Sequence, residues 1–262
     1  MQGRAFAKFC VATSGPHKVY TVLAHPTAPW REAKDDPQCA WAYALEHACG
    51  WADGTTTTNA MMSAVTSNLF YNMGFRYDTK EGAARYWIGN SFDLSGYLRR
   101  TKQTVCCYDQ AYGVVTLGNL LGATAKPVFT GIFGFIESTD LIGIGTCNNP
   151  FFEGDVETQH YVVLDDGRIV VRSFTVSRDP LCAIDELGRS SFGNHMYAFV
   201  NGLIFDACAG PILGTCSHGE YLSTVIDHST LSERENGYFF QWVPLERESA
   251  FDSVRYRFSE QQ

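Results

Sequence analysis

The sequence predicts an α+β domain in which helices pack on an antiparallel sheet. Three segments with helical patterns lie before residue 122, and segments with strand patterns, joined by short turns, follow from about residue 127. Helices followed by strands in this order are typical of a sheet that is covered by helices on one face. The chain has 262 residues, of which 45% are apolar and 14% aromatic, so it can bury a sizeable core and is not a disordered chain.

The charge balance argues against two classes of partner. There are 20 Lys and Arg against 28 Asp and Glu, and the run 99–102 (RRTK) is the only short basic cluster in the sequence. Nucleic acids and anionic membranes are bound through basic patches. No segment reaches the ~20 apolar residues of a membrane span, and the start MQGRAFAKFC lacks the apolar run of a signal peptide. We therefore expect neither a nucleic acid nor a membrane as partner. A cytoplasmic location and secretion as an effector both remain possible.

Periodicity and capping residues place the helices. A first helix over about 37–49 is expected to close at Gly50, because glycine is favoured just after a helix. The threonines at 55–58 can cap a second helix, whose apolar residues recur every three or four positions before Gly74. A third helix is expected over Cys107–Leu121, followed by Gly122.

Strand patterns and turn dipeptides describe the second half of the chain. The predicted strands cover 127–135, 160–164, 168–175, 195–200 and 203–205. Asp-Gly at 166–167 and Asn-Gly at 201–202 are typical hairpin turns, because both tolerate positive φ angles. These segments therefore predict antiparallel neighbours.

Cys107 lies at the expected first turn of the third helix, where a thiol can become a nucleophile. The helix dipole stabilises a thiolate there by ~0.3–1 kcal/mol. That is too little to form the thiolate at neutral pH, so an imidazole partner is required. The helix start could shift by one residue, which leaves Cys106 as an alternative. The nine cysteines form no CxxC pair and the seven histidines are scattered, so we expect no local zinc site.

His195 is the expected imidazole partner, and Asp206 is expected to orient it. If residue 200 faces residue 203 across the Asn-Gly turn, then 197 faces 206. Residues 195 and 197 share a face of the sheet, because strand side chains alternate. Asp206 is then diagonal to His195, at a spacing of about 7–8 Å that side chains can close. A nucleophile, a base and an orienting carboxylate make a catalytic triad.

Two segments resemble motifs of the transglutaminase-like superfamily. The segment 107–111 (CYDQA), with the following apolar helix and 121–128 (LGATAKPV), resembles its cysteine motif. The segment 194–206 (NHMYAFVNGLIFD) resembles its second motif, with a histidine on a strand, a turn and an aspartate closing the next strand. The helix at 59–73 followed by Tyr77 is similar to the region before the nucleophile. The resemblance covers about 59–128 and 190–210.

The resemblance implies a papain-like core and acyl transfer from an amide of a protein or peptide to Cys107. His195 would hold the thiolate and later protonate the leaving amine, while Asp206 orients it. The backbone N–H of Cys107 would be one oxyanion donor and Gln103 the second. The implied organisation is an extension over 1–54, packed on a catalytic domain over 55–262. That domain carries an insertion at about 129–190, which we expect to form a hairpin over the cleft. No metal or organic cofactor is implied.

Several alternatives remain at this point. The thioester can be resolved by water, as in a protease or deamidase, or by an amine, as in a cross-linking enzyme. A catalytically silent binding module and a toxin-type glutamine deamidase are the other functions considered. Cys107 is preferred over Cys106 because only Cys107 has an alanine four residues later, as in the motif.

Overall fold

The computed structural model describes residues 18–30, 42–89, 91–154, 157–163, 166–184, 186–227 and 246–248. The helices of this part are α1 (Ala42–Trp51), α2 (Thr58–Tyr71), α3 (Leu94–Leu98), α4 (Cys107–Leu120) and α5 (His218–Val225). The mixture of helices and strands confirms the predicted α+β class. Within the described ranges, no helix has the length and apolar character needed to cross a membrane.

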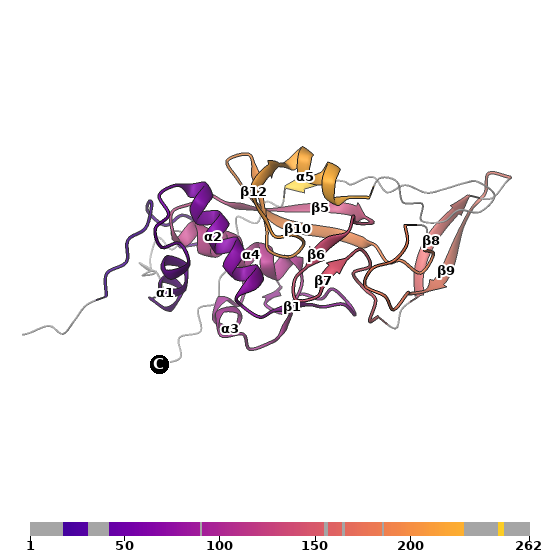
Figure 1. The fold of residues 1–262 in the computed structure, drawn as a ribbon, viewed down its shortest axis with the longest axis horizontal. Helices are drawn as coiled ribbons and strands as arrows, with labels where there is room; N and C mark the ends of the chain where they lie inside the picture. The colour runs from indigo at the N-terminus through magenta and orange to yellow at the C-terminus, as the bar shows by residue number, and fades with distance from the viewer. Residues whose placement is uncertain are drawn as a thin grey trace, which may run out of the picture.

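A five-stranded antiparallel sheet with the order β12-β11-β10-β5-β13 forms the centre of the molecule (Figure 1). Its strands are β5 (Lys126–Gly134), β10 (Phe192–Val200), β11 (Leu203–Asp206), β12 (Ile212–Ser217) and β13 (Glu246–Glu248). Helix α4 contacts β10, β11 and β5, and α2 packs against both α4 and β12. Helix α5 lies along β11 and β12. The predicted packing of helices on an antiparallel sheet is therefore present.

Four small two-stranded sheets surround this centre. They are β1 (Arg76–Tyr77) with β4 (Thr104–Val105), β2 (Trp87–Ile88) with β3 (Ser91–Phe92), β6 (Thr139–Leu141) with β7 (Gly145–Cys147), and β8 (Glu157–Val163) with β9 (Ile169–Thr175). The β8–β9 hairpin matches the strands predicted on either side of the Asp-Gly turn. It projects from the end of the molecule farthest from α1 in Figure 1, whereas the sequence suggested a hairpin over the cleft.

Two glycines inside α4 explain how this helix is almost completely buried. A Cβ at Gly113 would meet the Tyr97 ring of α3 at 2.7–2.9 Å. A Cβ at Gly118 would collide with the thioether of Met62 on α2. A larger residue at either position would force Tyr97 or Met62 to move, so the two glycines permit the close approach of neighbouring helices despite their low helix propensity.

The predicted end of α1 is wrong by a small margin. The helix continues through Gly50 to Trp51, and the left-handed residue that follows is Gly54, with φ +75°. The Trp51 ring packs edge-on against His47, one turn earlier, at 5.6 Å. This contact favours one further helical residue. The predicted start of this helix, at 37–41, lies outside the described residues.

The segment 18–30 runs along the carboxyl-terminal end of α4. Leu23 N–H donates to the Leu121 carbonyl at 3.2 Å, and the indole N–H of Trp30 donates to the Thr116 carbonyl at 3.0 Å. Trp30 is only 5% exposed. The described residues 18–30 therefore pack against the end of α4.

A buried ion pair joins the segment before β10 to the end of α5. The Arg189 guanidinium lies 2.8 Å from the Asp227 carboxylate, and both side chains are 1% exposed. Arg189 also donates to the backbone carbonyls of Asn148 and Ile136. A β-bridge between Ile136 and Ile226 reinforces the connection. This cluster fixes the long connection between β5 and β10 to the core.

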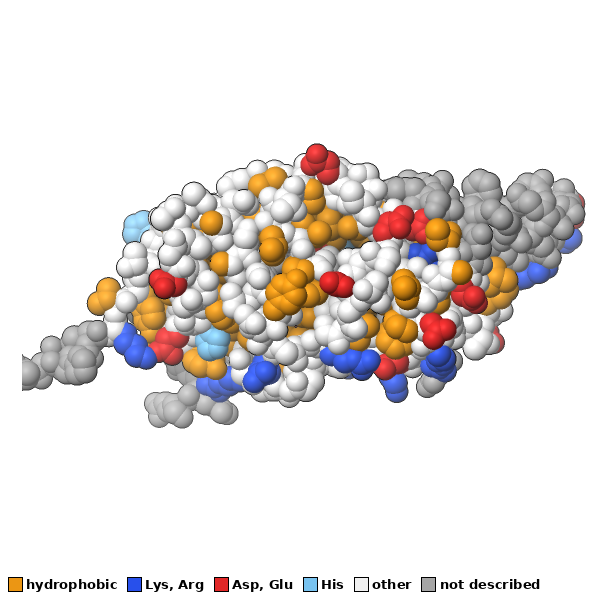
Figure 2. All heavy atoms as spheres, viewed as in Figure 1, with side chains coloured by type: hydrophobic (Ala, Val, Ile, Leu, Met, Phe, Trp, Pro, Cys, Tyr) orange, Lys and Arg blue, Asp and Glu red, His pale blue; other side chains and the backbone are white. Residues whose placement is uncertain are grey.

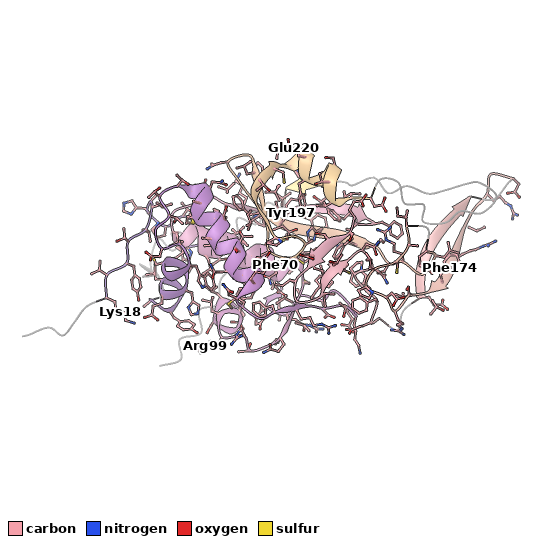
Figure 3. The ribbon with its side chains drawn as sticks, in the orientation of Figure 1. Lys18, Phe70, Arg99, Phe174, Tyr197 and Glu220 are labelled. Carbon is pink, nitrogen blue, oxygen red and sulfur yellow. The ribbon has the colours of Figure 1, made fainter. Side chains whose placement is uncertain are left out.

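Surface charge is mixed on the face shown in Figure 2. Lys and Arg side chains lie along the lower edge of this view, interspersed with Asp and Glu. Apolar side chains occupy part of the centre of the same face. Phe70 of α2, which is labelled in Figure 3, lies in this central region.

Candidate active site

The predicted hairpin between β10 and β11 brings His195 and Asp206 together. The register pairs Val200 with Leu203, as expected, and the turn residues Asn201 and Gly202 have φ +52° and +85°. His195 Nε2 lies 2.7 Å from Asp206 Oδ2. The two side chains are 0% and 1% exposed. The diagonal contact derived from strand alternation is therefore present and buried.

Asp206 is held by three further donors. Its Oδ1 accepts the backbone N–H groups of Cys208 at 2.7 Å and Ala209 at 3.2 Å. Its Oδ2 accepts the Tyr221 hydroxyl of α5 at 2.5 Å. Burial and the neighbouring Asp206 charge keep the pKa of Tyr221 well above its usual value of 10, so this phenol remains a donor. The carboxylate is therefore fixed in position and in orientation.

These contacts determine which ring nitrogen of His195 is basic. An ionised carboxylate only accepts hydrogen bonds, so the Nε2 atom that faces Asp206 must carry the proton. Nδ1 then holds the lone pair. In the described part of the chain, this buried atom has no hydrogen-bond partner. The ring is held between Phe133, at 4.9 Å, and Phe192, which stacks on it at 5.4 Å.

The start of α4 places Cys106 and Cys107 in different roles. Cys106 is the N-cap residue, with extended backbone angles, and Cys107 is the first helical residue. The pKa of the Cys106 thiol is well above its usual value, because of a hydrogen bond with Cys107 and because it is buried. Cys107 is 4% exposed. Of the two thiols, Cys106 is thus a poor candidate for a thiolate.

Tyr77 and Phe192 connect the start of α4 with the imidazole. Tyr77 pairs with Val105, two residues before Cys107, in the parallel β1–β4 ladder. Burial, followed by the Cys107 thiol, raises the pKa of Tyr77 well above 10. The Tyr77 ring contacts Phe192 at 5.6 Å, and Phe192 stacks on His195. Within the described residues, no hydrogen bond joins the Cys107 sulfur to His195.

Asp109 is a site residue whose role sequence reasoning missed. Its buried carboxylate accepts the backbone N–H of Cys106 at 3.1 Å and those of Arg85, Tyr86 and Trp87 at 2.8–2.9 Å. Burial raises the pKa of Asp109, and the four N–H donors oppose that increase. The carboxylate thus ties the loop at 85–87 to the start of α4. The only signal in the sequence is an acidic residue two positions after Cys107.

Gln103 is not brought together with the other predicted residues. Its side chain is exposed, just before β4, whereas Cys107, His195 and Asp206 are buried. Its backbone carbonyl accepts the N–H of Arg76 at 3.0 Å, which belongs to the β1–β4 pairing. An exposed side chain does not supply a donor inside a buried site, so the structure does not support Gln103 as the second oxyanion donor.

Among the residues that the structure describes, no group of three or more His, Cys, Asp or Glu side chains is arranged to hold a metal ion. Comparison with known proteins adds no relative: no family model, no curated protein and no solved structure matches this chain.

Proposed function

We propose that this protein is a cysteine-dependent acyltransferase or hydrolase with a transglutaminase-like, papain-like core, acting on an amide of a protein or peptide. The observation that carries the proposal is the buried His195–Asp206 pair, with Nε2 and Oδ2 2.7 Å apart and with an Nδ1 atom that has no hydrogen-bond partner among the described residues. A buried base with a fixed tautomer is what a neighbouring thiol needs for activation.

The proposed reaction begins at Cys107. Its thiol proton passes to His195 Nδ1, and the sulfur attacks the carbonyl carbon of the substrate amide. The imidazolium that forms is stabilised by Asp206. The Cys107 N–H lies in the first turn of α4 and has no acceptor within the helix, so it can donate to the oxyanion. In place of Gln103, we assign the second donor to the Tyr77 hydroxyl, whose pKa the Cys107 thiol helps to raise.

Collapse of the tetrahedral intermediate completes the first half-reaction, in which Cys107 is acylated. The C–N bond breaks, His195 Nδ1–H protonates the leaving amine, and the acyl group remains on the Cys107 sulfur as a thioester. Water or a second amine then attacks the thioester carbonyl. His195 accepts the proton of that nucleophile, and the thiol is restored. The triad has the same part in hydrolysis and in amine transfer, so the choice between them depends on which nucleophile reaches the thioester.

One observation favours a second candidate, a binding module without turnover. Cys107 is 4% exposed and His195 is fully buried, so a substrate must reach a covered thiol. In a silent module, Cys107 would be a buried apolar side chain, which is the common environment of free cysteine.

The pH dependence of alkylation separates the two candidates. Iodoacetamide would be applied to the native protein between pH 5 and 9. Each cysteine would be quantified by peptide mass mapping, with fragmentation between residues 106 and 107. Cys49 and Cys216 are internal references, because burial raises the pKa of both partly exposed thiols. An active site is expected to alkylate Cys107 at pH 6 about tenfold faster than either reference, since an ordinary thiol has a pKa near 8.5.

Three variants make the outcome specific. His195→Ala should return Cys107 to the behaviour of an ordinary thiol, whereas His25→Ala, at an exposed histidine, should leave it unchanged. Cys106→Ser keeps a favourable N-cap residue and should preserve the effect. If the alkylation rate of Cys107 in the native protein has the pH dependence of an ordinary thiol, the enzyme proposal is overturned in favour of the silent module. Reactivity that disappears in Cys106→Ser would assign the nucleophile to Cys106.

A further inference from the structure

A strip of three partly exposed aromatic rings lies beside the proposed nucleophile. It consists of Trp87 on β2, Tyr108 on α4 and Phe129 on β5. We propose that this strip is a substrate subsite that binds an aromatic side chain next to the amide being attacked. The inference rests on the proposed function, because it names the class of substrate for the same site.

The rings of the strip contact one another in series, stacked between Trp87 and Tyr108 and tilted by 50° between Tyr108 and Phe129. Trp87 is stacked on Tyr108 with centroids 5.2 Å apart, and on Tyr112 with centroids 5.7 Å apart and planes within 9° of parallel. Tyr108 and Tyr112 are one helical turn apart, so Trp87 lies across both of them. Tyr108 continues to Phe129 at 6.3 Å. Tyr112 is buried, whereas Trp87, Tyr108 and Phe129 retain exposed surface.

The strip is adjacent to the start of α4, which carries the proposed nucleophile. Tyr108 directly follows Cys107, and the N–H groups of Trp87 and Cys106 donate to the same carboxylate, that of Asp109. Phe129 lies on the sheet face opposite His195, because His195 pairs with Thr130 and strand side chains alternate. A side chain bound on this strip is therefore close to the chain position whose amide meets the thiol. This continuity with the site favours the acyl-donor chain as the occupant.

Trp87 is also fixed relative to the nucleophile. Its backbone N–H donates to Asp109 Oδ1 at 2.8 Å, and the same carboxylate accepts the N–H of Cys106 at 3.1 Å. A rigid aromatic surface loses little freedom when a ligand binds, so its stacking contributes to affinity.

The chemistry of the strip selects an aromatic ring over an aliphatic or charged side chain. Aromatic pairs prefer offset-stacked or edge-to-face arrangements, and such contacts add to the burial of area. The gain corresponds to about a tenfold increase in rate or affinity for a substrate that carries the ring. We therefore expect the acyl donor to carry Phe, Tyr or Trp next to the reactive amide.

Two alkylating probes with the same reacting carbon test this subsite in the full chain. The probes are iodoacetamide and N-benzyl iodoacetamide, and the readout is the ratio of their second-order rate constants at Cys107, measured at pH 6. The native protein is expected to prefer the benzyl probe about tenfold, and Trp87→Ala should bring the ratio close to one. Phe129→Ala, a second variant in case Trp87→Ala does not fold, should lower the ratio about threefold. Tyr71→Ala, at an aromatic residue of α2 that is 61% exposed, should leave the ratio unchanged.

The possible results separate the subsite from the enzyme. A native ratio near one, or a tenfold ratio that Trp87→Ala leaves unchanged, would overturn the subsite while Cys107 still reacts with iodoacetamide. A Cys107 that shows no elevated reactivity with either probe would overturn the proposed function and the subsite together. A benzyl preference that appears equally at Cys49 would mean general hydrophobic labelling and would also overturn the subsite.

Discussion

Tyr221→Phe tests whether α5 contributes to the geometry of the His195–Asp206 pair. The substitution removes one hydroxyl and keeps the ring, so it opens no sizeable cavity. The lost contact is the 2.5 Å hydrogen bond to Asp206 Oδ2, between two side chains that are at most 1% exposed. Hydrogen bonds to charged groups contribute about 1.5–3 kcal/mol. Asp206 keeps three other donors, so we expect a loss near the lower end, about 1.5–2 kcal/mol.

Urea unfolding at pH 7, followed by circular dichroism, measures this loss. The unfolding midpoint should fall while the slope of the transition stays the same, because the change removes a contact without altering the surface exposed on unfolding. Tyr71→Phe, at an exposed tyrosine, is the matched control and should change stability by less than about 0.5 kcal/mol. A double-mutant cycle with Asp206→Asn should give a coupling energy above about 1 kcal/mol. A Tyr221→Phe loss below about 0.5 kcal/mol, or a coupling of zero, would refute the reasoning.

Three other changes have defined outcomes. Asp206→Asn can present an amide N–H to the imidazole and reverse its tautomer, so the elevated alkylation rate at pH 6 should be lost; retention of that rate would contradict the orienting role. Arg189→Met removes the buried ion pair with Asp227 and should cost about 3–5 kcal/mol in urea unfolding, whereas a loss below about 1 kcal/mol would show that the ion pair is dispensable. Burial raises the pKa of Tyr77 and Tyr97 well above 10, so folding favours the neutral form of both side chains. The free energy of unfolding should therefore be constant in this respect below pH 10, and should fall above pH 10 by about 1.4 kcal/mol per pH unit for each phenol. Absorbance at 295 nm should therefore show these two tyrosines ionising only as the protein unfolds, and their titration near pH 10 in the native protein would contradict the assignment.

The parts of the fold that sequence reasoning predicted depend on local chemistry. The Asn201-Gly202 turn tolerates positive φ angles, so it sets the register of β10 and β11 and, through strand alternation, the contact between His195 and Asp206. Thr57 caps α2 by accepting the Ala60 N–H at 3.2 Å, as the threonine cluster suggested. In these cases the residues that decide the structure are close together in the sequence.

The parts that were missed depend on contacts between distant segments. Tyr221 reaches Asp206 from a later helix, and Asp109 binds N–H groups of a loop more than twenty residues earlier. The periodicity of apolar residues along the sequence does not predict contacts between such distant segments. The prediction for Gln103 rests on its position four residues before Cys107, but its side chain, next to the β1–β4 pairing, is exposed. The error at Gly50 has the same origin, because the ring contact of Trp51 with His47 extends the helix past a residue that usually ends one.

Helix α4 separates two surfaces of this molecule. It carries Cys107 at one end, and the segment 18–30 binds the other end through Thr116, Asn119 and Leu121. With 14 residues at about 1.5 Å each, the two ends are about 20 Å apart. A chain bound at Cys107 and a partner bound to the segment 18–30 therefore do not compete for space. A label or tether attached to this segment leaves the approach to the thiol open, which makes it the natural attachment point for assays on immobilised protein.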